Sequence, residues 1–299
     1  MSKKTEKVRR FLSKDASIRV SSVVAPELLL EVQKISGLSP LAAIAVGRAS
    51  LACVLMASHH KEDRVSLHFD GSGPLGRLFV EASFDGNMRA YVTNPYVDLP
   101  PVNGKLDVSG AVGHGLLNVT HTSGLNKSPY RGTVIIKTGE IGSDVAFYLQ
   151  QSHQIPSIVS LGVHLDKDGL IDAAGGVLIE LMPGHDEALI EKLEKNLEGA
   201  KAISDMLLEG LDEKELVSAY MGDIAFEEIE HPYNLNYSCT CSEERLKNSL
   251  ILLGEEELGH LLKTKEATEI RCDFCGKKYY LANQEIEVLQ EQSRKKSMH

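Results

Sequence analysis

The sequence predicts an α+β protein: a largely antiparallel sheet core domain with helices over residues 1–184, an acidic helical linker over 185–231 and a small cysteine-bearing domain over 232–299. Three observations support this prediction. Strand-like runs separated by tight turns fill the first part, helix formers dominate the second, and four of the five cysteines lie at or after position 239. A chain of 299 residues also suggests more than one domain.

Three hairpins account for much of the predicted sheet. The runs VSLHF and RLFVEASF are separated by the loop GSGPLG, RLFVEASF and MRAYVTN by Asp85-Gly86, and SIVSLGVHL and LIDAAGGVLIELM by the turn around Asp168-Gly169. Short glycine-containing turns between such runs are typical of antiparallel hairpins. They favour an α+β protein over a doubly wound parallel sheet.

Two helices are expected in the same part of the chain. The apolar segment 41–58 follows Ser39, an N-cap residue, and Pro40, which suits a first helical turn. A second helix, SDVAFYLQQSHQ, is expected to begin at Ser143, with an acid just inside its start. Cys53 lies within the first helix and is expected to be a small core residue rather than a reactive thiol.

No export or membrane signal is expected. Segment 41–58 is interrupted by Arg48 and rich in alanine, which favours a buried helix over a membrane span. The charged amino terminus lacks the apolar core of about 7–15 residues that a secretory signal needs. A cytoplasmic protein is therefore expected.

Motifs for nucleotide or enzymatic chemistry are weak. GSGPLG at 71–76 matches GxGxxG, but a strand follows where a dinucleotide site needs a helix, and Pro74 removes an amide from the loop. The chain contains neither GxxxxGK[ST] nor GxSxG. Its eleven histidines are scattered and indicate no acid–base pair. The protein is not expected to be an enzyme.

The acidic charge is concentrated in the linker. The chain has a formal net charge of −10, and residues 185–231 contain fourteen acids and four lysines, so the remainder is balanced. Nucleic-acid binding usually needs a basic face, and residues 232–299 contain eleven acids and ten bases. Nucleic acid is therefore disfavoured as the main partner. The linker is also amphipathic, so short helices packed on the core domain describe it better than a flexible tether.

The four late cysteines form two local pairs. Cys239 and Cys241 form C-x-C, and thirty residues later Cys272 and Cys275 form C-x-x-C. Four soft ligands arranged as two chelating pairs predict a tetrahedral Zn²⁺ site with one ion per chain. His260 lies between the pairs and could compete as a ligand. Two permanent disulfides are disfavoured in a reducing cytosol, and a C-x-x-C redox enzyme would need a βαβ context.

The site could be purely structural, or it could respond to oxidants. Four thiolates and one Zn²⁺ sum to −2, partly offset by nearby basic residues, so the sulfurs stay ionised and nucleophilic. Each pair could close a local disulfide, which would release the metal. A small unit that depends on zinc would then unfold, and the linker beside it could expose its apolar side. The basic residues are Arg245, Lys247, Arg271, Lys277 and Lys278.

These residues resemble the redox-regulated heat-shock chaperone family of about 33 kDa, and the resemblance covers nearly the whole chain. Its most specific mark is the C-x-C, thirty, C-x-x-C spacing, in which all four ligand positions match. The other matching segments are GPLG at 73–76, NPYVDLP at 94–100, QIPSIVSLGV at 154–163, AAGGVLIELMPG at 173–184 and CDFCGKKY at 272–279.

The resemblance implies a bacterial cytosolic, ATP-independent holdase. Its reduced, zinc-bound form would be inactive. Its oxidised form would carry the disulfides Cys239–Cys241 and Cys272–Cys275, dimerise, and bind unfolding proteins until other chaperones take over. The four cysteines would be both zinc ligands and redox sensor, with the C-x-x-C pair oxidising first. The linker and the sheet domain would share client contact.

Two other classes of function remain open from the sequence. A zinc-dependent regulator that binds nucleic acid would need a basic face, and a mobility shift at physiological salt would reveal it. A thiol–disulfide oxidoreductase would turn over insulin disulfides catalytically, whereas a holdase would only bind its clients.

Overall fold

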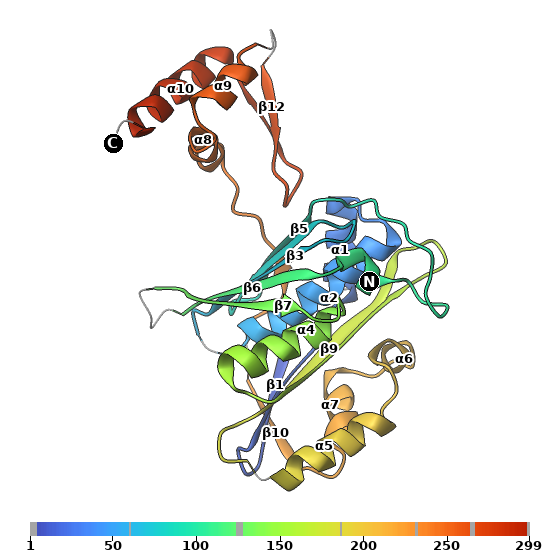
Figure 1. Cartoon of the computed structure of the whole chain (residues 1–299). Coiled ribbons are helices and arrows are strands. Elements are labelled where there is room, and N and C mark those ends of the chain that lie inside the picture. The colour runs from blue at the N-terminus through green and yellow to red at the C-terminus, as the bar shows by residue number, and fades with distance from the viewer. Residues whose placement is uncertain are drawn as a thin grey trace. The chain divides into compact units, whose positions relative to one another are not determined.

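The computed structural model of the protein describes residues 5–59, 61–123, 128–185, 187–230, 233–263 and 267–297. Contacts within the chain divide it into two compact units, Met1–Ser238 and Cys239–His299 (Figure 1). The predicted α+β class is confirmed, since antiparallel sheets and helices make up both units. Two residues at the expected linker boundary, His231 and Pro232, lie outside the described part of the chain.

The first unit contains a five-stranded antiparallel sheet, which we call sheet A. Its strand order is β10-β1-β2-β9-β8, so β10 and β8 are the edge strands. The predicted hairpin around Asp168-Gly169 is confirmed as β8 and β9. The strands are β1 (Val8–Ser13), β2 (Ile18–Val24), β8 (Ser157–Leu165), β9 (Ile171–Leu181) and β10 (Phe226–Ile229).

A six-stranded sheet, sheet B, completes the strands of this unit. Its order is β11-β5-β4-β3-β6-β7, antiparallel except for β11, which runs parallel to β5. The two other predicted hairpins are confirmed as β3–β4 and β4–β5. The strands are β3 (Arg64–Gly71), β4 (Arg77–Ser83), β5 (Asn87–Val92), β6 (Gly115–Thr122), β7 (Tyr130–Ile136) and β11 (Asn236–Tyr237).

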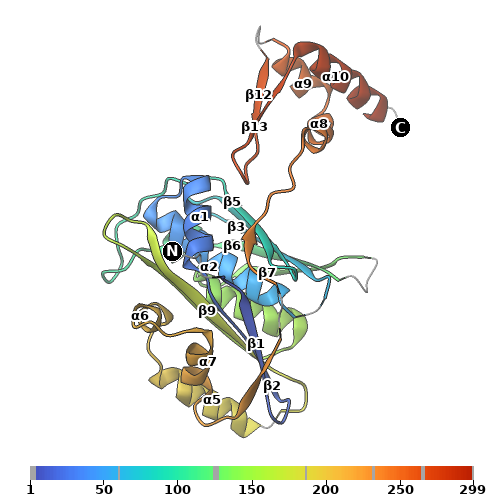
Figure 2. The same ribbon diagram turned by 180° about the vertical axis from the view of Figure 1, so that it is seen from behind.

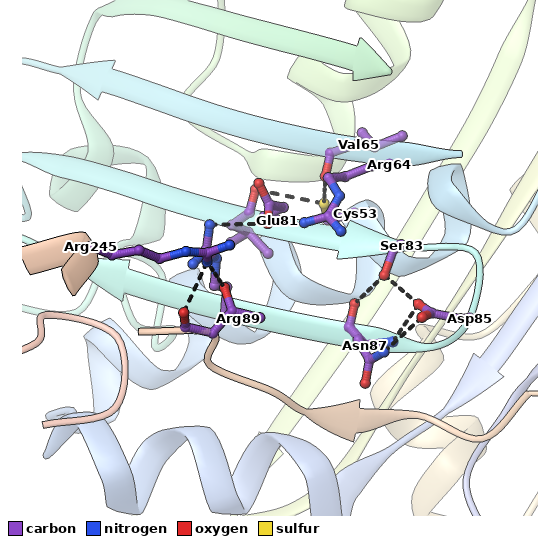
Figure 3. A network of polar contacts seen from close by, with 11 residues as sticks. Cys53, Arg64, Val65, Glu81, Ser83, Asp85, Asn87, Arg89 and Arg245 are labelled. Atoms are coloured by element: carbon purple, nitrogen blue, oxygen red, sulfur yellow. Dashed lines mark hydrogen bonds and ion pairs between the residues drawn. The ribbon is translucent and has the colours of Figure 1, made fainter. Parts of the chain in front are cut away.

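Gly86 in the β4–β5 turn has a second role that the sequence does not reveal. Asp85 accepts hydrogen bonds from Ser83 Oγ and, over 2.8 Å, from Asn87 Nδ2, which closes the turn (Figure 3). Gly86 has φ +85°, and a Cβ there would lie 2.1 Å from the carbonyl oxygen of Asn234. Glycine therefore lets the segment that leads to β11 pass against the turn.

The central helix α2 (Pro40–Ala57) contacts strands of both sheets (Figure 1). Among the described residues it alone is long and apolar enough to cross a membrane, but 89% of it is buried inside the protein. Ser39 is the N-cap residue as predicted, yet its side chain makes no cap hydrogen bond. Its hydroxyl instead donates to the carbonyl of Val97 over 2.8 Å, tying the helix start to a distant loop.

Three further helical segments and a short π-helix surround this core. The predicted start of the second helix at Ser143 is wrong, because α4 begins at Ile141 with Glu140 at the cap position. The carboxylate of Asp144 is fully buried and accepts backbone hydrogen bonds from residues 137, 138 and 139, so it caps the preceding loop. These elements are α1 (Pro26–Ser36), α3 (Val108–Val112), α4 (Ile141–Tyr148) and the π-helix Leu149–His153.

The acidic segment forms α5 (Glu187–Gly199), α6 (Ile203–Leu208) and α7 (Glu213–Met221), followed by β10. The helices pack on one face of sheet A, where α6 contacts β8 and β9 and α7 contacts β2 (Figure 2). The hydroxyls of Tyr220 and Ser160 are 2.8 Å apart across this contact. The segment buries Leu193, Ile203, Met206, Leu216, Val217, Tyr220 and Met221 against strand residues that include Phe11, Val20 and Ile179.

Within the residues that the structure describes, the second unit has three helices and one hairpin. Its apolar core is small and consists of Leu250, Ile251, Leu258, Leu281, Ile286 and Leu289. A unit of this size with so few buried apolar side chains usually needs a metal or disulfides for stability. The elements are α8 (Glu243–Ile251), α9 (Glu255–Leu261), β12 (Thr268–Arg271), β13 (Lys278–Leu281) and α10 (Asn283–Ser297).

Candidate metal centre

The hairpin of the second unit positions one cysteine pair. The register of β12 and β13 pairs Arg271 with Lys278, so the C-x-x-C segment forms the connecting turn. Within it, the amide of Cys272 donates to the carbonyl of Lys277 over 2.9 Å, and the amide of Gly276 donates to the carbonyl of Cys272 over 2.8 Å. Gly276 has φ +70°, a conformation that glycine adopts without steric cost. The turn therefore presents both thiols on the same side of the hairpin end.

The other pair lies just before α8, whose start holds it in place. Ser242 is the N-cap residue and its hydroxyl accepts the amide hydrogen bond of Arg245. The Arg245 guanidinium in turn donates to the carbonyl of Thr240 over 2.9 Å and to its hydroxyl over 2.5 Å. Thr240 is the middle residue of C-x-C, so these bonds fix the backbone between Cys239 and Cys241.

All four sulfur atoms lie within 4.8 Å of one another. Cys239 Sγ is 3.7 Å from Cys272 Sγ, and Cys241 Sγ is 3.4 Å from Cys275 Sγ. Four sulfurs bound to Zn²⁺ at about 2.3 Å would be roughly 3.8 Å apart, whereas a disulfide needs about 2.05 Å. The four thiols are free cysteines, and their spacing fits a shared metal ion.

Burial and hydrogen bonding give the thiols of the centre different pKa values. Cys272 is buried and the other three are half-buried. Burial raises the pKa of Cys239 to about 12 and also raises that of Cys275. Burial opposes ionisation of Cys241 too, but a hydrogen bond from Tyr279 and the neighbouring thiols outweigh it and lower its pKa to about 7. Binding a metal here requires that the remaining thiols lose their protons as well.

Tyr279 is a site residue that the sequence analysis missed. Its hydroxyl donates to Cys241 Sγ over 3.2 Å, and Lys277 Nζ lies 5.0 Å from the centre of its ring. Tyr280, the next residue, is exposed and bonds to Glu269 instead. The phase of β13 decides which tyrosine reaches the sulfur, because successive side chains of a strand point to opposite faces.

Two of the basic residues expected to offset the negative charge of the sulfurs form ion pairs with carboxylates instead. Lys247 is 2.6 Å from Glu243 and 2.7 Å from Glu285, and Lys278 is 2.9 Å from Glu269. These lysines therefore already have carboxylate partners. The Arg271 side chain lies closer to the turn, since a Cβ built on Gly276 would be 3.0 Å from its Nη2.

The structure brings the four expected ligands together and leaves out His260, the competing candidate. His260 is exposed on α9, and among the described residues the metal-compatible group contains only the four cysteines. Cys53 is fully buried in α2, where its thiol donates to the carbonyl of Val65 over 3.3 Å (Figure 3). Burial strongly raises the pKa of Cys53, so this thiol stays protonated and packed.

Comparison with known proteins agrees with this centre. The chain matches the Hsp33 protein family over residues 6–282. The chain belongs to the Hsp33 family. The match runs through both compact units and includes all four cysteines of the centre.

Relatives of the family are similar along most of their length. The chain is 42% identical over 252 residues to the 33 kDa chaperonin of Desulfotalea psychrophila, covering 84% of this chain and 85% of that protein. It is 39% identical over 276 residues to the 33 kDa chaperonin of Caldanaerobacter subterraneus subsp. tengcongensis, covering 90% and 92%. These names describe chaperones rather than enzymes.

A solved structure of the family has the same fold. The crystal structure of the 33 kDa chaperonin (heat shock protein 33 homolog) from Thermotoga maritima superposes with a TM-score of 0.85 at 30% identity. The match covers 98% of this chain and all of that one. The protein is therefore a chaperone of the Hsp33 family, and its four-cysteine cluster can hold a metal ion.

Proposed function

We propose that the protein is a redox-regulated, ATP-independent holdase whose switch is the four-cysteine centre. The observation that supports this most strongly is the convergence of four thiols within 4.8 Å in a unit with only a small apolar core. The metal is Zn²⁺, one ion per chain, because four thiolates in tetrahedral spacing are ligands that zinc prefers. Zinc would hold the sulfurs as thiolates and stabilise the fold of the second unit.

Oxidation would convert this centre in two two-electron steps. In each step two thiolates lose two electrons and form one disulfide, and a peroxide takes up the electrons and two protons to give water. The pairs are Cys239–Cys241 and Cys272–Cys275. The sulfur contacts of 3.7 Å and 3.4 Å run between these pairs, so forming both disulfides requires the two sulfurs within each pair to approach to about 2.05 Å. The ligands are then lost and zinc leaves.

Loss of zinc would release the linker. We assign residues 1–184 to a core domain, 185–231 to the linker and 232–299 to the zinc-binding domain. The linker packs within the compact unit Met1–Ser238, and β11 leads from it toward Cys239 by pairing with β5. Unfolding of the zinc-binding domain would free this connection. The linker would then expose its buried apolar side and the strand residues beneath it to unfolding client proteins.

Light scattering of a thermally unfolding client without ATP tests this function. Peroxide-treated protein should suppress aggregation, reduced protein should not, and reductant should reverse the effect. A chain that ends at Glu230 should be active even when reduced, because its linker has lost its restraint. Equal suppression by reduced and oxidised wild type would exclude the switch, and a requirement for ATP would exclude a holdase. Sedimentation of the same samples tests whether the active form is a homodimer, as we expect for this cytoplasmic chaperone.

A further inference from the structure

The linker ends in a strand that is held mostly by backbone pairing. β10 lies at the edge of sheet A and, among the strands that the structure describes, pairs with β1 alone. Side-chain contacts add to the pairing: Phe226 packs edge-on against Phe11 at 5.5 Å and lies at the margin of the apolar cluster, and Glu228 accepts two hydrogen bonds from Arg9 over 2.8 and 2.5 Å. Phe226 and Ile229 are only half-buried. Such a strand can leave its partner without breaking a tightly packed core.

The strand beneath β10 would keep its shape after that departure. β1 pairs on its other side with β2, which pairs with β9 in the middle of the sheet. The β1–β2 turn is closed by its own side chains: Ser17 Oγ donates to Asp15 Oδ1 over 2.7 Å, and the amide of Ile18 donates to Ser13 Oγ over 2.9 Å. None of these bonds involves the linker. β1 would therefore become an ordered strand with one open edge.

The register shows which backbone groups would be opened. The amide of Lys14 donates to the carbonyl of Ala225 over 3.1 Å. Residues along a strand alternate between its two neighbours, so Arg10 and Leu12 also direct their N–H and C=O groups toward β10, whereas Phe11 directs its groups toward β2. An open row of strand N–H and C=O groups is a template for another extended chain.

We propose that an extended segment of an unfolding client protein takes the place of β10 and adds a strand to β1. This inference rests on the proposed function, since it requires that oxidation release the linker. The segment would carry a large apolar side chain opposite Ser13, where Phe226 packs on Phe11, and a carboxylate within reach of Arg9. Its other contacts would be backbone hydrogen bonds, which do not depend on client sequence. β10 itself shows the occupant that this edge fits.

Comparison with β8, the other edge strand of sheet A, shows why oxidation would control access to the edge of β1 in particular. β8 has no strand on its outer side within the described residues, and the linker packs against it through α6 rather than by strand pairing. Loss of the linker would therefore change the strand pairing of β1 but not that of β8. Amides of β8 serve as an internal comparison.

Hydrogen exchange of single amides in the full-length protein tests the proposal. The amides of Arg10 and Leu12 should be protected in the reduced protein, exchange at least about tenfold faster after oxidation, and regain protection when reduced, carboxymethylated α-lactalbumin is added as a permanently unfolded client. The amide of Phe11 should stay protected throughout. A peptide with the sequence of residues 224–230 should bind the oxidised protein and compete with the client. The same peptide methylated on alternate backbone nitrogens should bind at least about tenfold more weakly.

The outcomes separate this inference from the function on which it rests. If the client binds and the Arg10 and Leu12 amides still exchange rapidly, strand addition is wrong although the holdase stands. If these amides stay protected after oxidation at every protein concentration, the linker is not released and both proposals fail. If they are exposed in dilute oxidised protein but become protected without a client as the protein concentration rises, a second copy occupies the edge, and the assignment to a client is wrong.

Discussion

The hydroxyl of Tyr279 donates a hydrogen bond to the sulfur of Cys241 over 3.2 Å. A hydrogen bond to a charged acceptor contributes about 1.5–3 kcal/mol, because it stabilises the anion. Tyr279 thus supports the metal centre without being one of its four cysteines. The hydrogen bond to the sulfur also raises the pKa of the Tyr279 hydroxyl to about 12. The tyrosine is therefore a neutral donor at every pH at which the protein would work.

Tyr279→Phe should weaken zinc binding by roughly tenfold and speed the release of zinc by peroxide, since the Cys241 thiolate loses its donor and becomes more nucleophilic. A chromogenic zinc chelator measures both effects. Tyr280→Phe is the matched control, because its hydroxyl bonds to Glu269 and not to sulfur. Equal zinc affinity in both variants would show that the tyrosine does not support the centre.

Cys272→Ser should lower zinc affinity by more than about 100-fold, since loss of a direct ligand exceeds the effect of losing an outer partner. Its second unit should also unfold at a lower denaturant concentration. Cys53→Ser should bind one zinc per chain and lower the free energy of unfolding by only about 1 kcal/mol, because a hydroxyl can keep the bond to Val65. Zinc titration and urea unfolding measure these effects. A normal zinc content in Cys272→Ser would contradict the ligand assignment.

Proteolysis should report the state of the linker. A glutamate-specific protease should cut residues 187–230 slowly in the reduced protein and quickly after oxidation, because cleavage needs an unfolded segment. Tyr220→Phe removes the hydrogen bond to Ser160, which should lower the free energy of opening the linker by about 1 kcal/mol. Cleavage of the reduced form should then be roughly fivefold faster. Tyr96→Phe, at an exposed ring, should change nothing. Identical cleavage before and after oxidation would show that the linker does not respond to the centre.

Acid should loosen β10 through Glu228. The hydrogen bond from Arg9 lowers the pKa of Glu228 below its usual value near 4.5. The Arg9–Glu228 pair therefore contributes its full stabilisation at a pH above the pKa that Glu228 has in the unfolded chain. This contribution is lost as the pH falls through the lower pKa that Glu228 has in the folded protein. Exchange of the Arg10 and Leu12 amides in the reduced protein, corrected for the intrinsic pH dependence, should rise between about pH 5 and pH 3. The effect should be small because the pair is partly exposed.

Glu228→Gln is the control for that experiment. It lacks the titrating group, so the same amides should show a flatter pH profile and be less protected at pH 7. Should the variant keep the full pH dependence of the wild type, the Arg9–Glu228 pair would not be its cause.

The sequence by itself determined the three hairpins, the central helix, the helical linker and the spacing of the four cysteines that converge. Each of these depends on neighbours in the chain: turn glycines set strand reversal, apolar spacing sets helix faces, and the short gap within each cysteine pair makes it a chelate. Two expectations based on local capping were less accurate. Ser39 takes the N-cap position of α2 as predicted, but its hydroxyl donates to Val97, which only folding brings near. The helix expected to begin at Ser143 begins at Ile141, and Asp144 instead accepts hydrogen bonds from the amides of the loop at 137–139.

Only the tertiary structure decided the remaining features. Phe226–Ile229 carries no strong strand signal of its own and becomes β10 because β1, more than two hundred residues earlier, offers it an open edge. Tyr279 reaches Cys241 while Tyr280 does not, because the pairing of β12 with β13 sets which face each side chain occupies. Lys247 and Lys278 are paired with carboxylates that only folding brings near. Contacts between residues distant in sequence depend on the packing of the whole unit, so local patterns cannot predict them.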